Sequence, residues 1–292
     1  MADTITAVHI KAYTDLVLMR AQQKDSRMRA WAKTKDNVKG ESVSFDRIGK
    51  VEMQGKASRH APTPNADPNH ERRWATLATH HTNVLLDADD LQAVLTDPTS
   101  DYVTVVSAAV GRKWDKLILD AALGTALTGV SGAGSETWPV TDRKSVSHQI
   151  AAGGTGLTVG KVRQAKRIMD AIMVESDRCF VTDAYGLEDL LETTEVTSSD
   201  YNAVKALVRG ELNTWLGYEW IMVDSDVMTV SGTTVSAVAM ARGAVGLGIG
   251  IDRKIRISER PDLSYANQVY AEMMGGSVRR DGERIVEVQY VQ

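Results

Sequence analysis

The sequence predicts an α+β fold with mixed sheets, one long helix and a protruding β-hairpin. Apolar and charged residues alternate along 41–56 and along 70–86, on either side of a proline-rich passage, which is typical of two hairpin strands. Apolar residues recur at steps of three and four over 100–123, as in an amphipathic helix. The last third of the chain, from residue 235, consists of strand-like runs. Strands grouped apart from helices favour the α+β class.

The composition is that of an ordinary soluble globular protein. The 292 residues are 43% hydrophobic and 25% charged, which is enough material for one large or two modest domains. The formal net charge of -4 argues against non-specific nucleic-acid binding over the whole surface. Cys179 is the one cysteine, so an internal disulfide is excluded, and its apolar neighbours predict a buried thiol. No apolar run is long enough to cross a bilayer, and the N-terminus lacks a secretory signal pattern. We therefore expect no membrane partner and synthesis in the cytoplasm.

The N-terminal unit, residues 5–32, admits two interpretations. Its apolar residues recur at near-helical spacing and basic residues follow them. It is either a surface helix or an arm that reaches over a neighbouring molecule, and the sequence leaves both open.

The ribbon over 41–86 is the most informative segment. An arm of about 15 residues reaches roughly 50 Å, and a lone two-stranded ribbon is marginally stable in water. The ribbon has few large apolar groups, so we expect its partner surface to be another protein chain. We interpret its mixed charges as complementary to neighbouring chains rather than as a solvated face. The candidate interface residues are Arg47, Lys50, Lys56, Arg59, Arg72, Arg73 and Trp74.

The helices and strands after the ribbon follow from capping and periodicity. A short helix is predicted over 87–96, before a proline. The long helix begins with Ser100 as N-cap and ends at Gly124; about 24 residues span about 36 Å, enough for the backbone of an elongated subunit. Residues 128–156 are a glycine-rich loop or irregular hairpin. Further helices are predicted over 158–174, 183–191 and 204–216, and strands over 178–182, 219–223, 235–240, 244–250, 254–258, 265–274 and 284–291.

Two glycine-rich runs resemble nucleotide-binding loops but fail on spacing. In 153–161 a phosphate-binding loop would need a glycine at position 155 and a serine or threonine at position 162, but the chain has Thr155 and Val162 there. In 246–250 a dinucleotide-binding turn needs glycine or alanine at the position of Ile251. The second run instead predicts a tightly packed strand that another backbone approaches closely.

The sequence offers no catalytic, cofactor or metal site. His80 and His81 are adjacent on a predicted strand, so they face opposite sides and do not converge on one metal ion. One cysteine provides no thiolate cluster, and the chain has no Gly-x-Ser-x-Gly motif. We therefore expect a protein that is not an enzyme.

The order of these parts resembles the major capsid proteins of tailed double-stranded-DNA bacteriophages, a fold shared with encapsulins and the herpesvirus capsid floor. The resemblance covers nearly the whole chain and depends on an ordered set of segments rather than on one motif. The segments are the arm, the charged ribbon, 111–124, 204–220, 244–249, 260–262, 268–271, 275–280 and 285–288.

The resemblance implies a tailed-phage major capsid fold with five regions. These are an N-terminal arm over 1–40, an extended β-hairpin loop over 41–86, a peripheral domain over 87–150 with the long spine helix at 100–123, an axial domain over 151–250, and return strands of the peripheral domain over 251–292.

The resemblance also implies a structural function. Many copies would form hexamers and pentamers of an icosahedral head, in the virion, that encloses double-stranded DNA without sequence specificity. The other expected partners are a portal protein, a decoration protein and a separate scaffolding protein, because the arm begins almost at residue 1. The shell would be made and assembled in the host cytoplasm.

Two alternative functions and one chemical modification remain open to test. The first is an encapsulin-type shell that packages enzyme cargo. The second is a soluble enzyme that uses the loop at 153–161, which the spacing disfavours. The third is covalent cross-linking of subunits through Lys50 or Lys56, for which the sequence shows no matching asparagine and acidic residue.

Overall fold

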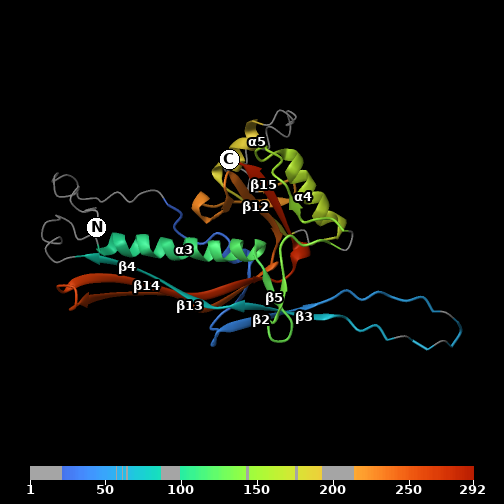
Figure 1. The fold of residues 1–292 in the computed structure, drawn as a ribbon, viewed down its shortest axis with the longest axis horizontal. Coiled ribbons are helices and arrows are strands. Elements are labelled where there is room, and N and C mark those ends of the chain that lie inside the picture. The colour runs from blue at the N-terminus through green and yellow to red at the C-terminus, as the bar shows by residue number, and fades with distance from the viewer. Residues whose placement is uncertain are drawn as a thin grey trace.

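The computed structural model is elongated, with its longest helix along the long axis (Figure 1). It describes residues 22–56, 58–60, 62–63, 65–86, 99–142, 145–174, 177–192 and 214–292. The predicted helix over 87–96 lies outside these ranges, as do residues 1–21 of the arm and residues 204–213 of the helix predicted over 204–216. The described end of that predicted helix is wrong, because Thr214–Trp215 form a strand that pairs with Tyr218 and Glu219. The described α-helices are α3 (Thr99–Leu123), α4 (Val159–Ala171) and α5 (Ala184–Glu192).

The described strands form three sheets. Sheet one has the order β1-β13-β14-β4, from Lys33–Lys35, Val245–Arg260, Ala266–Arg279 and Ala78–Leu86. Sheet two has the order β7-β15-β12-β8-β10-β9, from Gln149–Ile150, Ile285–Val291, Thr234–Ala241, Arg178–Thr182, Tyr218–Met222 and Thr214–Trp215, with β11 (Thr229–Ser231) beside β12. Sheet three has the order β2-β3-β5-β6, from Ser42–Ile48, His70–Thr76, Ala126–Thr128 and Gly134–Glu136. The α+β class is confirmed.

Helix α3 lies along sheet one and matches the predicted helix over 100–123 within one residue. Its stripe buries Trp114, Ile118 and Leu119. Gly275 on β14 faces the indole ring of Trp114, and a Cβ at that glycine would overlap the ring. The close approach of helix and strand therefore depends on a glycine opposite a tryptophan.

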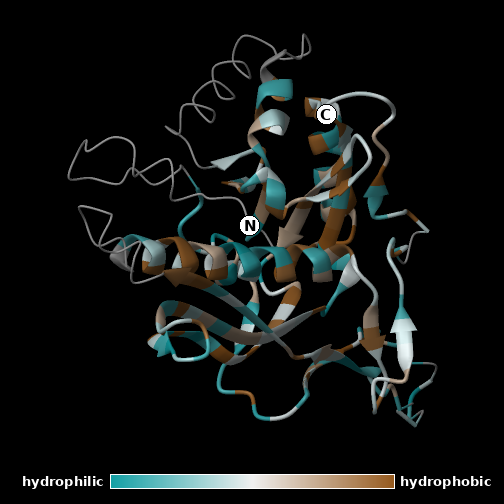
Figure 2. Cartoon of the chain, turned by 60° about the vertical axis from the view of Figure 1, so that its left-hand side comes forward, coloured by the Kyte–Doolittle hydropathy of each residue, from teal (hydrophilic) through white to brown (hydrophobic). Residues whose placement is uncertain are grey.

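Sheet two carries α4 and α5 and forms a second layer above α3 (Figure 1). Thr158 caps α4 by accepting a hydrogen bond from the amide of Lys161. Every residue of β8 is buried, and burial raises the pKa of the Cys179 thiol well above its usual range. The prediction of an inert buried thiol is confirmed. Figure 2 shows hydrophobic residues on α3 and on the strands of sheets one and two.

Residues 22–32 are not an α-helix. They run along α3 with one 3-10 turn at Arg29–Trp31 and then join β13 as the parallel strand β1. In this part of the N-terminal unit the near-helical spacing places Met28 and Trp31 in the core of the chain's own fold. Periodicity over such a short stretch did not distinguish a helix from an extended segment that packs on a helix.

The hairpin is shorter than the 41–86 range predicted from alternation. Its strands β2 and β3 pair from Ser42↔Thr76 to Ile48↔His70, and β4 instead pairs with β14. The chain passes from sheet three to sheet one at Leu77, which is buried. Alternation continues through that residue, so it does not reveal that the strand changes sheets.

The last strand also differs from the predicted division of the chain. The sequence placed 251–292 together in one domain, but β15 lies in sheet two with β12 and β7. Conversely, the predicted strands over 244–250 and 254–258 are one long strand, β13, in sheet one. The chain therefore crosses between the two layers after β12 and again after β14.

Candidate functional site

The base of the hairpin is anchored in its own chain. Val43 and Phe45 of β2 are buried in a small apolar cluster. The phenyl ring of Phe45 lies over Gly246 of β13, where a Cβ would come within 2.8 Å of it, and Val43 covers Gly248 in the same way. The tight packing predicted for the glycine run is confirmed, but the groups that approach it are side chains of the hairpin rather than another backbone. The sequence analysis expected the partner surface of the ribbon in another chain, whereas the base of the ribbon packs on its own chain.

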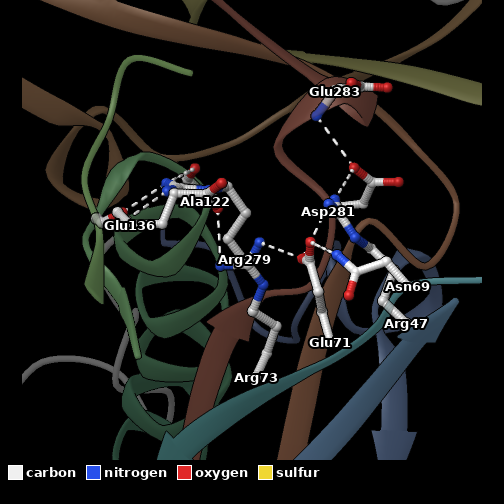
Figure 3. Close-up of polar contacts among 10 residues, drawn as sticks. Arg47, Asn69, Glu71, Arg73, Ala122, Glu136, Arg279, Asp281 and Glu283 are labelled. Atoms are coloured by element: carbon white, nitrogen blue, oxygen red, sulfur yellow. Dashed lines mark hydrogen bonds and ion pairs between the residues drawn. The ribbon is translucent and has the colours of Figure 1, made fainter. Parts of the chain in front are cut away.

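One ion-pair network joins the hairpin base to the chain between β14 and β15. Arg47 of β2 contacts Glu71 at 3.0 Å and Asp281 at 2.8 Å (Figure 3). Asn69 also donates to Glu71, at 3.3 Å. Asp281 accepts a further hydrogen bond from the amide of Glu283, at 3.2 Å. Arg47 thus connects residues more than 200 positions apart.

A second network surrounds Arg73, which is only 2% exposed. Its guanidinium lies 2.9 Å from a carboxylate oxygen of Glu136 and 3.2 Å from Glu71. The backbone carbonyl of Glu136 accepts a hydrogen bond from Arg279, at 2.8 Å (Figure 3). Burial lowers the pKa of Arg279, whose side chain also donates to the carbonyl of Gly124. In the single chain Arg73 therefore stabilises the hairpin base from within.

The outer face of the base is held by Arg72 and Trp74. Arg72 Nε donates to Asp46 at 2.6 Å, and this hydrogen bond lowers the pKa of the Asp46 carboxyl. The guanidinium also lies over the indole of Trp74, 5.8 Å from the ring centre. Trp74 Nε1 donates to the carbonyl of Gly129 at 2.8 Å, in the turn between β5 and β6. Both predicted interface residues are thus engaged with their own chain.

The hairpin tip, residues 49–69, differs from the base. The last ladder contact is the hydrogen bond from the amide of Gly49 to the carbonyl of Asn69, at 2.7 Å, and beyond it no strand pairing occurs among the described residues. Lys50 pairs with Glu52, while Lys56 and Arg59 are exposed. The tip extends past the rest of the chain at one end of the long axis (Figure 1).

Apolar side chains on and beside the tip are exposed to solvent. Met53 is fully exposed, and Ile48 and Val51 are about half or more exposed. Two grooves flank the hairpin base, with volumes of about 740 and 860 Å³. Val130, also largely exposed, lines the larger groove. The site is thus a charge-rich base, fixed by contacts within its own chain, with a partly apolar tip whose described residues form no strand pairs beyond Gly49.

The comparisons with known proteins place this arrangement in a family. A model of the phage capsid protein family matches residues 5–292. The chain belongs to the phage capsid protein family. No curated protein sequence matches this capsid-family chain.

Solved structures of capsids share its fold over nearly the full length. The capsid of the cyanophage P-SCSP1u superposes with a TM-score of 0.69 at 15% identity, covering 98% of this chain and 94% of that one. A structure of Mycobacterium phage Che8 gives 0.67 at 15% identity, covering 95% and 96%. The capsid of a native GTA particle gives 0.67 at 14% identity, covering 97% and 94%. The predicted major-capsid fold is confirmed.

The sequence analysis missed the partners of the basic hairpin residues. Glu136, Arg279 and Asp281 lie far from the hairpin in the chain, and no spacing links them to it. A charged residue next to a glycine-rich turn is typical of a solvated loop. Only the fold brings these side chains to the hairpin base.

The glycine-rich loop before α4 has a structural function in this capsid-family chain. The ammonium group of Lys161 donates to the backbone carbonyls of Ala152, Thr155 and Gly156 at 2.8, 2.9 and 2.8 Å. A phosphate-binding loop instead directs amides and a free lysine at the ligand. Within the described ranges no three His, Cys, Asp or Glu side chains are grouped to hold a metal ion, and no helix is long and apolar enough to cross a membrane.

Proposed function

We propose that this chain is the major capsid protein of a tailed phage and that its copies form hexamers and pentamers of an icosahedral head around double-stranded DNA. Family membership and the capsid fold support this proposal. The single observation that carries it is the hairpin: its base is fixed to its own chain, whereas the described residues of its tip form no strand pairs and are mostly exposed. A tip held in this way is suited to contact a neighbouring copy.

The seven predicted interface residues then divide into two groups. Arg47, Arg72, Arg73 and Trp74 fix the direction of the hairpin through contacts in their own chain. Lys50, Lys56 and Arg59 belong to the tip and contact a neighbouring subunit. A scaffolding protein, a portal protein, a decoration protein and packaged DNA are further proposed partners, with assembly in the host cytoplasm.

The test is to remove the tip without disturbing the base. Residues 50–68 are replaced by Asn-Gly, which closes a two-residue turn directly after the hydrogen-bonded pair of Gly49 and Asn69. We expect a soluble subunit with an unchanged melting temperature that no longer forms shells. Electron microscopy and sedimentation of the wild-type and shortened chains, made with the same helper proteins, measure this.

The matched control replaces the tip with a Gly/Ser segment of equal length. If both variants lose the ability to form shells, the side chains of the tip are required. If only the shortened variant loses it, the length of the tip is required. Normal shells from the Asn-Gly variant would overturn the proposed role of the tip.

An encapsulin-type shell is the second candidate function. The matching family is of phage capsids, and the capsid structures named above are of phages and a GTA particle, so the phage function is favoured. The contents of isolated particles distinguish the two: double-stranded DNA supports the phage head, and protein cargo without DNA supports the alternative.

A further inference from the structure

Three cations gather beside the hairpin base, and none of them forms an ion pair with a carboxylate of the described residues. Lys33 and Arg280 flank Gly243, whose added Cβ would lie 3.9 Å from Lys33 Cβ and 3.6 Å from Arg280 Nη1. Lys35 and Arg280 both lie over the ring of Phe45, at 4.9 and 5.9 Å from its centre. We call Lys33, Lys35 and Arg280 the cation cluster.

Arg280 has unused hydrogen-bonding capacity. Its Nη1 donates to the carbonyl of Gly243 at 2.9 Å, but its Nε is buried and has no hydrogen-bond partner in the chain. Burial, and then the charge of Arg284, lower the pKa of Arg280, and the charge of Asp281 partly opposes them. A partly buried charge with an unpaired donor is costly, so an incoming anion at this guanidinium would be favoured.

Arg280 also lines the smaller of the two grooves beside the hairpin base. Arg280 lines the 740 Å³ groove together with Arg47, Lys50, Arg284 and the carboxylates of the hairpin base and its neighbouring turn. The other cations of the groove have carboxylate partners: Arg47 and Arg284 contact Asp281, and Lys50 contacts Glu52. Within the described part of the chain, Arg280 is the one cation of this groove that forms no ion pair, and the charge of Asp281 acts on it only at longer range.

We propose that the cation cluster binds a carboxylate side chain of a second copy of this chain, which inserts into the groove. This inference rests on the proposed function, because it requires copies to pack against the hairpin base. Each copy carries an excess of carboxylates, with 38 Asp and Glu against 34 Lys and Arg. A guanidinium matches a carboxylate in geometry and charge, and the flanking lysines add charge.

A single carboxylate fits the groove better than a nucleic-acid backbone does. Asp46, Asp281 and Glu283 also line it, so its lining has nearly balanced charge. A DNA duplex carries one negative charge for about every 1.7 Å of its length, and these carboxylates would repel the phosphates adjacent to a bound one. One carboxylate on a protein loop avoids this repulsion.

The first test is zero-length cross-linking in shells assembled from equal amounts of ¹⁴N- and ¹⁵N-labelled wild-type chain. Carbodiimide activates a carboxylate, and a lysine amine in contact with it displaces the activating group to form an amide. We expect mixed-isotope peptide pairs in which Lys33 or Lys35 is joined to an Asp or Glu. A Lys33→Arg/Lys35→Arg variant keeps the charge but cannot react, so these pairs must disappear. Pairs of a single isotope only, or none, would overturn the proposal.

The second test compares matched losses of charge. Lys33→Gln/Lys35→Gln removes two exposed charges of the cluster, and Arg163→Gln/Arg167→Gln removes two exposed charges of α4. We expect at least a tenfold lower shell yield for the first variant than for the second, with melting temperatures equal to wild type. Arg280→Gln should act in the same direction. Equal yields from the two double variants contradict the proposal.

The outcomes separate this inference from the proposed function. Normal shells of the Lys33→Gln/Lys35→Gln variant that retain less DNA would indicate a phosphate ligand and would overturn the carboxylate assignment. If wild-type chain forms shells and every variant does so equally well, the inference alone fails. If wild-type chain forms no shells with its helper proteins, the proposed function itself fails.

Discussion

Glu287 shows at the residue scale how the fold accommodates a buried charge. Its carboxylate accepts hydrogen bonds from Ser236 at 2.7 Å, from Gln149 and Gln289 at 2.9 Å each, and from Trp138 at 2.5 Å. All four groups donate hydrogen bonds, and a carboxylate accepts them because both of its oxygens are acceptors. The buried carboxylate thereby links sheet two to the loop before β7.

Glu287→Gln is expected to destabilise the subunit by about 2 kcal/mol, because the amide group would direct its own hydrogen atoms at these donors. Urea unfolding of the purified subunit measures the change in free energy. The exposed Glu259→Gln is the control and should lie within about 0.5 kcal/mol of wild type. An unchanged midpoint for Glu287→Gln would contradict the proposed network.

His80 makes the stability of the subunit depend on pH. It lines a pocket of about 260 Å³ between α3 and sheet one, beside Lys113. Burial, and then the charge of Lys113, lower the pKa of His80 below its usual 6.5. The unfolded chain therefore binds a proton at this residue more readily than the folded chain, and stability is lost as the pH falls below about 6.5.

We expect a His80→Gln variant to lose less stability than wild type between pH 8 and pH 5. Thermal unfolding across this range measures the difference, and His81→Gln on the neighbouring position of β4 serves as control. A wild-type pH profile equal to that of His80→Gln would show that His80 does not titrate in this way.

At the element scale, α3 holds the N-terminal segment as well as the sheet. Asp115 is fully buried and accepts hydrogen bonds from the amides of Arg27 and Met28, at 3.0 Å each, and from Ser26 Oγ at 2.5 Å. One turn earlier, Gly111 leaves room for this segment, since a Cβ there would lie 3.0 Å from the backbone of Asp25. The stripe of apolar residues predicted the sheet-facing side of α3, but not this second contact.

Asp115→Asn should release residues 22–28 from α3, because one carboxylate oxygen becomes a donor that faces backbone amides. We expect a loss of about 2 kcal/mol and faster hydrogen exchange at the amides of Arg27 and Met28. Asp120→Asn, an exposed position on the same helix, is the control. Unchanged exchange in Asp115→Asn would indicate that other contacts hold the segment.

At the scale of the whole molecule, the subunit exposes apolar side chains at the end of its hairpin. The hairpin tip and the β13–β14 turn lie at opposite ends of the long axis (Figure 1). Met53, at the tip, is fully exposed, and a side chain without contacts adds little to the stability of one subunit. Its contribution is expected only when copies assemble, where burial of an apolar side chain is favourable.

Met53→Asp is therefore expected to leave the free energy of unfolding within about 0.5 kcal/mol of wild type and to reduce the yield of shells. Thermal unfolding and sedimentation measure the two effects separately, and Met53→Leu should assemble normally. Normal assembly of Met53→Asp would place the intersubunit contact elsewhere on the tip.

The sequence by itself determined the α+β class, the long helix, the buried strand around Cys179 and the ribbon with its charged face. Each depends on periodicity, capping or composition, which act between residues close together in the chain. Only the tertiary structure decided that the ring of Phe45 packs on Gly246, that β4 and β15 belong to different sheets, and that Arg47 forms an ion pair with Asp281. These contacts join distant segments, and their geometry depends on how whole elements pack, which local patterns do not encode.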